Sequence, residues 1–151
     1  MLIRTHLAVS LFFIFLFLPS VSFKILFLIV AFLATFIPDI DTGFSTFGRN
    51  AGWLLRFFTK HRGFFHSLTF CIMVSAIFAF FIPIIALPFF LGYSLHLFFD
   101  SFTKEGIRPF WPSKKSSSGF LRTGSMAESI IFLCFIVADI ILLIYMLSFV
   151  F

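Results

Sequence analysis

The four histidines of this chain lie at or near the ends of apolar segments, and carboxylates follow the ends of two such segments. One pair of carboxylates, Asp39 and Asp41, directly follows a proline turn, and Asp100 comes four residues after His96. Imidazole and carboxylate groups without thiolates are ligands that suit Zn²⁺, and also Mn²⁺ or Fe²⁺. We therefore predict a divalent metal centre, most readily of zinc. Its candidate ligands are His6, Asp39, Asp41, His61, His66, His96 and Asp100.

The spacing of these residues indicates how helices must present them. His96 and Asp100 share one helical face because they lie four residues apart, and Gly92 lies one turn earlier on that face. A glycine there would let a neighbouring helix approach closely. His61 and His66 are five apart and cannot share a face, so at least one belongs to a turn. The candidate ligands outnumber the roughly three or four that one catalytic zinc needs, which favours more than one ion.

A centre of this kind activates a bound water for attack on a phosphoryl or carbonyl group. We predict Glu128, at the start of the last apolar segment, and Asp41 as catalytic carboxylates, with a ligand or orienting role also open for Glu128. Arg62 lies between two of the histidines and is predicted to bind a phosphate. Asp139 lies about three turns beyond Glu128, where we predict a protonated or hydrogen-bonded structural carboxyl.

The composition excludes a soluble globular class. Hydrophobic residues make up 61% of the chain and charged residues 11%, and 29 of the 151 residues are phenylalanine. The length allows one compact membrane domain over residues 1–151 and no second domain. The net charge of +5 comes without a basic stripe on a polar scaffold, so we predict no nucleic-acid partner. Cys71 and Cys134 lie inside apolar runs and are predicted to be small core residues.

Five apolar segments run from about 7 to 18, 23 to 37, 68 to 82, 84 to 99 and 127 to 151. Prolines 19, 38 and 83 end the first three of them. The predicted fold class is therefore all-α: a polytopic membrane helical bundle with about five transmembrane helices. Several segments are nearer 15 residues than the roughly 20 that cross a hydrocarbon core.

Threading these segments back and forth brings every candidate ligand to the side of the membrane that holds the N-terminus. Ten of the eleven basic residues fall on the same side, and Lys24 alone falls on the other. Because positive charge accumulates in cytoplasmic loops, the metal site is predicted to face the cytoplasm. The ten are Arg4, Arg49, Arg56, Lys60, Arg62, Lys104, Arg108, Lys114, Lys115 and Arg122.

The first segment also has an alternative interpretation as a secretory signal peptide. Arg4 precedes an apolar stretch, and Ser20-Val21-Ser22 offers a cleavage site. Cleavage there would remove His6, and the next apolar segment would follow at once. A transmembrane helix is therefore favoured.

Taken together, the motifs resemble the membrane-bound metal-dependent hydrolase family of the YdjM and YbcI type. They stand in the family's order over almost the whole chain, as Thr5-His6, Pro38-Asp39-Ile40-Asp41, His61-Arg62-Gly63-x-x-His66-Ser67, Gly92-Tyr93-x-x-His96-x-x-x-Asp100 and Thr103-x-x-Gly106. The resemblance implies a small integral inner-membrane protein with hydrolase activity. A looser likeness links the chain to zinc-dependent phospholipase C proteins, which share an early histidine, a Pro-Asp turn and His-x-x-x-Asp.

The predicted function is hydrolysis of a phosphoester, of lipid type, at the cytoplasmic face of the inner membrane. The expected partners are membrane lipid and a lipid or phosphoester substrate. One rival is a metal-ion carrier or channel without hydrolytic activity, which would place its ligands near mid-membrane in broken helices. A second rival, haem binding, would pair histidines on facing helices, and the acidic neighbours argue against it.

Overall fold

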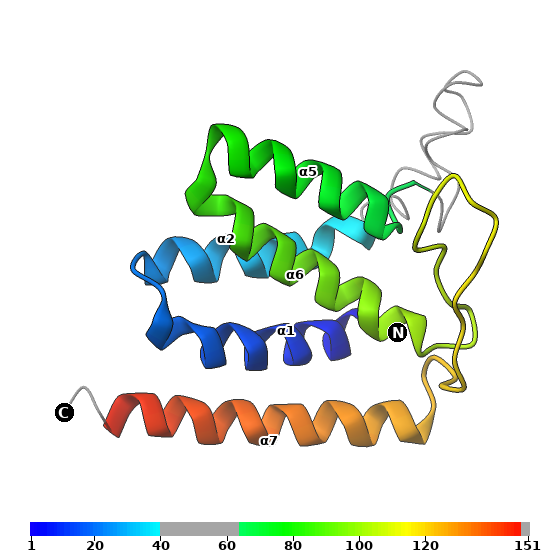
Figure 1. Ribbon diagram of the computed structural model, residues 1–151. Helices are drawn as coiled ribbons and strands as arrows, with labels where there is room; N and C mark the ends of the chain where they lie inside the picture. Colours follow the sequence, from blue (N-terminus) through cyan, green and yellow to red (C-terminus); the bar gives the residue numbers. More distant parts are fainter. Residues whose placement is uncertain (40–63, 149–151) are drawn as a thin grey trace, which may run out of the picture.

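The computed structural model describes residues 1–39 and 64–148, and within these ranges every regular element is helical. Two isolated bridges, Thr103 with Leu121 and Ile107 with Ser117, are the nearest approach to β-structure in that part of the chain. The elements are α1 (Ile3–Phe17), η1 (Leu18–Ser20), α2 (Lys24–Phe36), η2 (Ile37–Asp39), α5 (Leu68–Phe81), α6 (Pro83–Ser101) and α7 (Met126–Ser148). The architecture is the predicted all-α membrane bundle (Figure 1).

Prolines and a serine set the helix ends, as the sequence indicates. Pro19 and Pro38 lie in the short 3-10 turns η1 and η2 that follow α1 and α2. Pro83 occupies the first position of α6, where its missing N–H costs no hydrogen bond. Ser67 caps α5, because its hydroxyl accepts a hydrogen bond from the Phe70 N–H at 3.1 Å.

The helices pack around α6 and α1. Helix α6 contacts α5 and α2, whereas α1 contacts α2 and α7, so that α7 forms one outer edge of the bundle (Figure 1). The buried core includes Phe89 and Tyr93 of α6 and Ile14 of α1. Cys71 is buried there as predicted, but the prediction for Cys134 was wrong, because it is exposed on α7.

One contact brings two helix backbones together. Gly92 of α6 lies directly against Ala31 of α2, and a Cβ atom at Gly92 would clash with the Ala31 carbonyl. The prediction that this glycine admits a neighbouring helix is thus confirmed.

Among residues 1–39 and 64–148, three helical stretches are long and apolar enough to cross a membrane, namely Ile3–Ser20, Pro83–Ser101 and Met126–Ser148. The window within α7 has only 6% of its residues buried inside the protein, as expected for a helix facing lipid. Helices α2 and α5, with 13 and 14 residues, span only about 20 Å at ~1.5 Å per residue. Prolines stop both before the length needed for a full crossing, and local membrane thinning would accommodate them.

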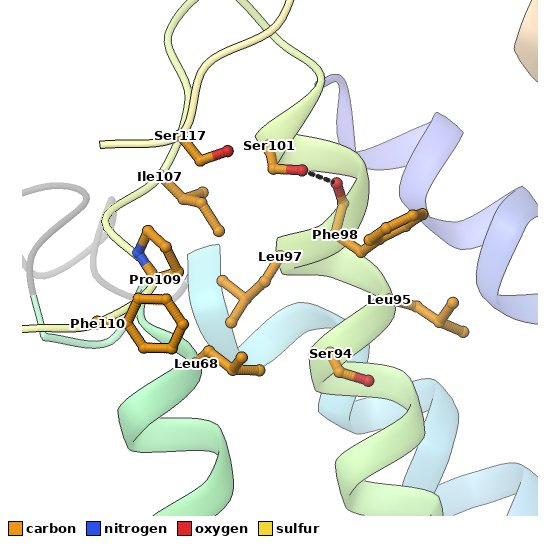
Figure 2. A pocket seen from close by; sticks show the side chains of 10 residues that line it. All are labelled: Leu68, Ser94, Leu95, Leu97, Phe98, Ser101, Ile107, Pro109, Phe110 and Ser117. Carbon is orange, nitrogen blue, oxygen red and sulfur yellow. Dashed lines mark hydrogen bonds between the residues drawn. The ribbon is translucent and has the colours of Figure 1, made fainter. Parts of the chain in front are cut away.

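The helix directions place all predicted ligand positions of the described chain at one end of the bundle. The N-terminus and the connection 102–125 lie at that end, and α7 finishes at the opposite end (Figure 1). A pocket of about 440 Å³ lies beside the same connection, between α5 and α6 (Figure 2).

A Gly92→Ala substitution should destabilise the bundle by about 1–3 kcal/mol, because the added methyl group forces α2 and α6 apart. Thermal unfolding in detergent, followed by circular dichroism, measures the effect. Ala79→Val, which adds bulk at an exposed position of α5, is the control and should unfold near the wild-type temperature. Equal unfolding temperatures for Gly92→Ala and wild type would show that the close approach is not needed.

Candidate metal centre

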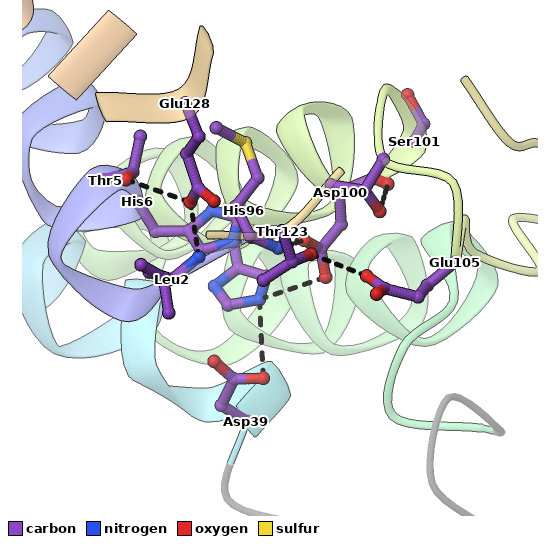
Figure 3. Close-up of polar contacts among 12 residues, drawn as sticks. Leu2, Thr5, His6, Asp39, His96, Asp100, Ser101, Glu105, Thr123 and Glu128 are labelled. Carbon is purple, nitrogen blue, oxygen red and sulfur yellow. Dashed lines mark hydrogen bonds and ion pairs between the residues drawn. The ribbon is translucent and has the colours of Figure 1, made fainter. Parts of the chain in front are cut away.

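Five of the seven predicted ligands meet at the end of the bundle. His6 comes from the first turn of α1, Asp39 from η2, His66 from the turn before α5, and His96 and Asp100 from the last turns of α6. The three imidazoles are 1% exposed and Asp100 is 2% exposed. Figure 3 shows the side chains of His6, Asp39, His96 and Asp100 converging from these separate elements.

Other residues that the sequence singled out do not belong to the described cluster. Asp41, His61 and Arg62 lie outside the described residues. Asp139 lies within α7 and is 7% exposed, and its carboxylate oxygens have no hydrogen-bond partner among the described residues. The predicted structural hydrogen bond of Asp139 is therefore not found in that part of the chain.

The clustered ligand atoms form two overlapping groups that could each hold a cation. His6, His96 and Asp100 make the first group, and Asp39, His66 and His96 make the second. Within each group the ligand atoms lie within 4.8 Å of one another, and His96 is common to both. The arrangement can therefore accommodate two neighbouring ions or one ion with a choice of ligands.

The tautomer of His96 follows from its partner. Its Nδ1 atom lies 2.9 Å from the carbonyl oxygen of Thr35, and a carbonyl only accepts, so Nδ1 donates its proton. That carbonyl is available because Thr35 lies in the last turn of α2. In the neutral ring the lone pair then resides on Nε2, which is buried and has no hydrogen-bond partner among the described residues.

The Nε2 atom of His96 lies 3.7 Å from Oδ1 of Asp39 and 3.7 Å from Oδ2 of Asp100. A lone pair facing two carboxylates in a buried site is unfavourable unless a cation lies between them. A backbone carbonyl that fixes the far nitrogen is also the usual support of a metal-binding histidine. The donor set therefore fits a divalent metal ion.

Asp100 and His6 hold the other side of the cluster together. Oδ1 of Asp100 lies 3.1 Å from Nε2 of His6 and also contacts the amine of Met1. The imidazole of His6 stacks on that of His96, with ring centroids 3.8 Å apart and an interplanar angle of 7°. This stacking fixes both rings at the same level of the bundle.

Asp39 is the most accessible member of the cluster, with its side chain 32% exposed. Burial raises the pKa of this carboxyl, but the hydrogen bond with His66 and the nearby His96 outweigh it, so the net shift is downward. Asp39 is therefore ionised at neutral pH, as a ligand must be.

Glu128 lies beside the cluster with its carboxylate turned to the backbone. Oε1 accepts hydrogen bonds from the Leu2 N–H at 2.6 Å and from the Thr5 hydroxyl at 3.1 Å. Oε2 accepts from the Gly124 N–H at 2.6 Å. The first amides of a helix lack intrahelical partners, and a carboxylate satisfies them well. Glu128 thus anchors the start of α1, which carries His6, while its predicted catalytic role stays a prediction.

Sequence reasoning missed two supports of the cluster. The Thr35 carbonyl could not have been found, because any residue at that position carries the same backbone group. Tyr93 is fully buried, and its hydroxyl donates to the Phe65 carbonyl beside His66. Its position directly after Gly92 was the available signal.

The profile of the YdjM inner membrane protein family matches residues 1–150. The chain belongs to this family. No curated protein and no solved structure gives a match. Membership of the YdjM family agrees with the apolar helices and associates the chain with the inner membrane. The family description extends neither to hydrolysis nor to the likeness with phospholipase C.

Replacing Glu128 by glutamine should lower the free energy of unfolding by about 1–3 kcal/mol, because an NH₂ group would face one of the backbone donors. Metal affinity should fall as well, because the start of α1, which carries the candidate ligand His6, would be held less firmly. Thermal unfolding and metal titration measure both effects. A variant with wild-type stability and metal affinity but slowed turnover would instead support the catalytic role.

The matched control is Glu105→Gln. This carboxylate also accepts a hydrogen bond, from the Thr123 hydroxyl at 2.7 Å, but it is exposed. Its replacement should change stability by no more than about 0.5 kcal/mol. A larger loss would mean that the effect of Glu128→Gln is not specific to its hydrogen bonds with the backbone.

Proposed function

We propose that the chain is a metal-dependent hydrolase embedded in the inner membrane, acting on a lipid-type phosphoester at the cytoplasmic face. The observation that carries the proposal is the buried Nε2 atom of His96, held by Thr35 so that its lone pair faces two carboxylates. Zinc suits these ligands best, and Mn²⁺ or Fe²⁺ would also fit. The overlap of the two ligand groups at His96 supports a site for more than one ion.

When bound, such an ion supplies Lewis acidity and an activated water. The residues of the chain supply the rest. Thr35 orients His96, and Asp100 orients His6. The buried histidines keep bulk water from the inner side, whereas Asp39 leaves the outer side accessible. In this proposal Asp41 remains a catalytic carboxylate and Arg62 the residue that binds the phosphate, with Glu128 positioning α1.

The position of the cluster supports a lipid-type substrate. All its members lie at helix ends on one end of an apolar bundle, which corresponds to the depth of lipid head groups. A phosphodiester at that depth would meet the accessible side of Asp39 without leaving the membrane. Ten of the eleven basic residues are predicted on this side, which favours an anionic substrate.

A metal-ion carrier is the second candidate. Asp139 favours it, since this buried carboxylate lies in the spanning helix α7 and lacks a hydrogen-bond partner in the described chain. Against it, the other ligands lie at one end of the bundle, and α1, α6 and α7 run unbroken through the depth of the bundle.

Replacing His96 or Asp100 by alanine should remove the bound metal. The loss of affinity should exceed the roughly 10- to 100-fold change typical of an outer partner of a ligand. Elemental analysis of the purified protein, followed by a hydrolysis screen with phosphodiesters and phospholipids, provides the measurement. Asp139→Asn, which removes a carboxylate outside the cluster, is the control and should retain the metal.

The outcomes separate the two candidates. Hydrolysis that disappears together with the metal supports the enzyme. If metal-loaded wild type carries ions across liposomes but cleaves no phosphoester, and Asp139→Asn stops the flux, the carrier replaces it. Unchanged metal content in His96→Ala would contradict both.

The proposed orientation has the N-terminus in the cytoplasm and the C-terminus on the opposite face. A reporter that is active only in the cytoplasm should be silent when fused after Phe151 and active when fused before Met1, because positive charge holds the connecting loops inside. A cytoplasmic signal from the C-terminal fusion would contradict the orientation. A mature chain that starts after Ser22, detected by mass spectrometry, would support the signal-peptide alternative instead.

A further inference from the structure

A second site lies on the other side of α6 from the metal cluster. The pocket of about 440 Å³ is bounded by the start of α5, the last turns of α6 and the connection that follows (Figure 2). Phe98 and Ser101, which line it, project from the side of α6 away from His96 and Asp100. The pocket is therefore separate from the cluster, and an occupant of it would not touch the ligands.

The lining is suited to an apolar chain. Leu68, Leu97, Ile107 and Phe110 supply hydrocarbon from all three elements. Two serines of the lining direct their hydroxyls to their own helix: Ser94 donates to the Leu91 carbonyl at 3.3 Å, and Ser101 donates to the Phe98 carbonyl at 2.6 Å. A volume within the roughly 300–1,000 Å³ range of ligand pockets leaves room for part of an acyl chain.

The connection that borders the pocket carries positive charge. Five exposed cations belong to the connection 102–125, whose only acidic residue, Glu105, accepts a hydrogen bond from Thr123. Arg108 lies in sequence between two lining residues, Ile107 and Pro109. The five cations are Lys104, Arg108, Lys114, Lys115 and Arg122.

Exposed aromatic side chains alternate with these cations. Phe102, Phe110 and Phe120 are 37%, 61% and 77% exposed. Basic residues interleaved with exposed aromatics are typical of a segment that lies in the head-group region of an anionic membrane. The rings would enter the acyl region while the cations meet phosphate.

The connection is held in shape before any ligand binds. Backbone hydrogen bonds of 2.9 Å join Ile107 and Ser117 in both directions, and the Lys104 N–H donates to the Leu121 carbonyl at 2.8 Å. Gly119 lies against the backbone of Phe102 so closely that a Cβ atom would clash. A preformed rim reduces the entropy lost on binding.

We infer that this pocket binds an anionic phospholipid, with an acyl chain between α5 and α6 and the phosphate against the cations of the connection. The charge of the head group distinguishes the classes of lipid. A zwitterionic lipid would fill the pocket equally well, but electrostatic attraction to the five cations would add little to its binding free energy. A soluble phosphate ester would meet the cations but leave the apolar pocket empty.

Tryptophan fluorescence tests the site directly, since Trp111 follows Phe110 at the rim. In a Trp53→Phe background, the protein is reconstituted in phosphatidylcholine vesicles with a small fraction of phosphatidylglycerol brominated on its acyl chains. Trp111 should be quenched at a lower mole fraction of this lipid than of brominated phosphatidylcholine. Equal quenching by the two lipids would overturn the inference.

Two variants separate the charge from the pocket. Arg108→Gln should weaken the preference for phosphatidylglycerol about fivefold, the effect of one cation near the surface. Ser94→Phe should fill the pocket and reduce quenching by both lipids. If neither variant changes the quenching, the lipid contacts Trp111 from the bulk bilayer and the site does not exist.

The controls match these changes. Lys24→Gln removes an exposed cation at the far end of the helices, and Ser129→Phe adds a ring at an exposed serine of α7 that also donates to its own helix. Both should behave as wild type. Asp100→Ala should keep the lipid preference, so that failure of the metal proposal and failure of this one are distinguishable.

Discussion

The close backbone contact between α2 and α6 is the constraint on which the geometry of the candidate metal centre depends. The two helices run in the same direction, and Gly92 lies against Ala31 (Figure 1). One turn further along each helix, His96 reaches the carbonyl oxygen of Thr35. A Cβ atom at position 92 would clash with the Ala31 backbone and force the two helices apart. The Thr35 carbonyl would then lie too far from the ring of His96 to fix its tautomer.

A further turn along, each helix segment carries an aspartate, Asp39 on η2 and Asp100 on α6. On each helix the contacting residues are four apart, so they lie on one face. Both carboxylates therefore come close to His96, with an oxygen of each 3.7 Å from its Nε2 atom. The geometry of the candidate site is therefore a consequence of helix periodicity combined with one glycine. Tyr93, which follows that glycine, donates a hydrogen bond to the Phe65 carbonyl. This contact holds the backbone next to His66 against α6.

Much of the architecture could be predicted because its causes are local. Prolines end α1, α2 and α5 wherever the sequence places them, and the apolar runs leave helix as the only structure that satisfies the backbone in lipid. The position of five candidate ligands at one end of the bundle could be predicted by threading the apolar segments back and forth across the membrane. The hydrogen bonds of Glu128 could not be foreseen, since they depend on which backbone amides approach α7. The exposure of Cys134 could not be foreseen either, since it depends on the position of α7 in the bundle. A helix at the edge of a bundle buries few of its side chains.

Helix α6 joins the two proposed sites, since it carries the candidate ligands His96 and Asp100 on one side and lines the proposed lipid pocket with the other. Placing the buried Asp100 and the partly exposed Asp39 among three imidazoles is costly unless positive charge compensates them. In the described part of the chain the amine of Met1 contributes one such charge at Asp100, and a bound cation or a protonated ring would supply the rest. On the other side of the helix the balance is reversed, because five cations of the connection have one acidic residue among them. Anionic lipid would compensate the excess positive charge there, just as a metal ion would compensate the excess negative charge at the cluster. The same helix thus lies between a cluster suited to a cation and a connection suited to an anionic group, which is why the two proposed ligands are of opposite charge.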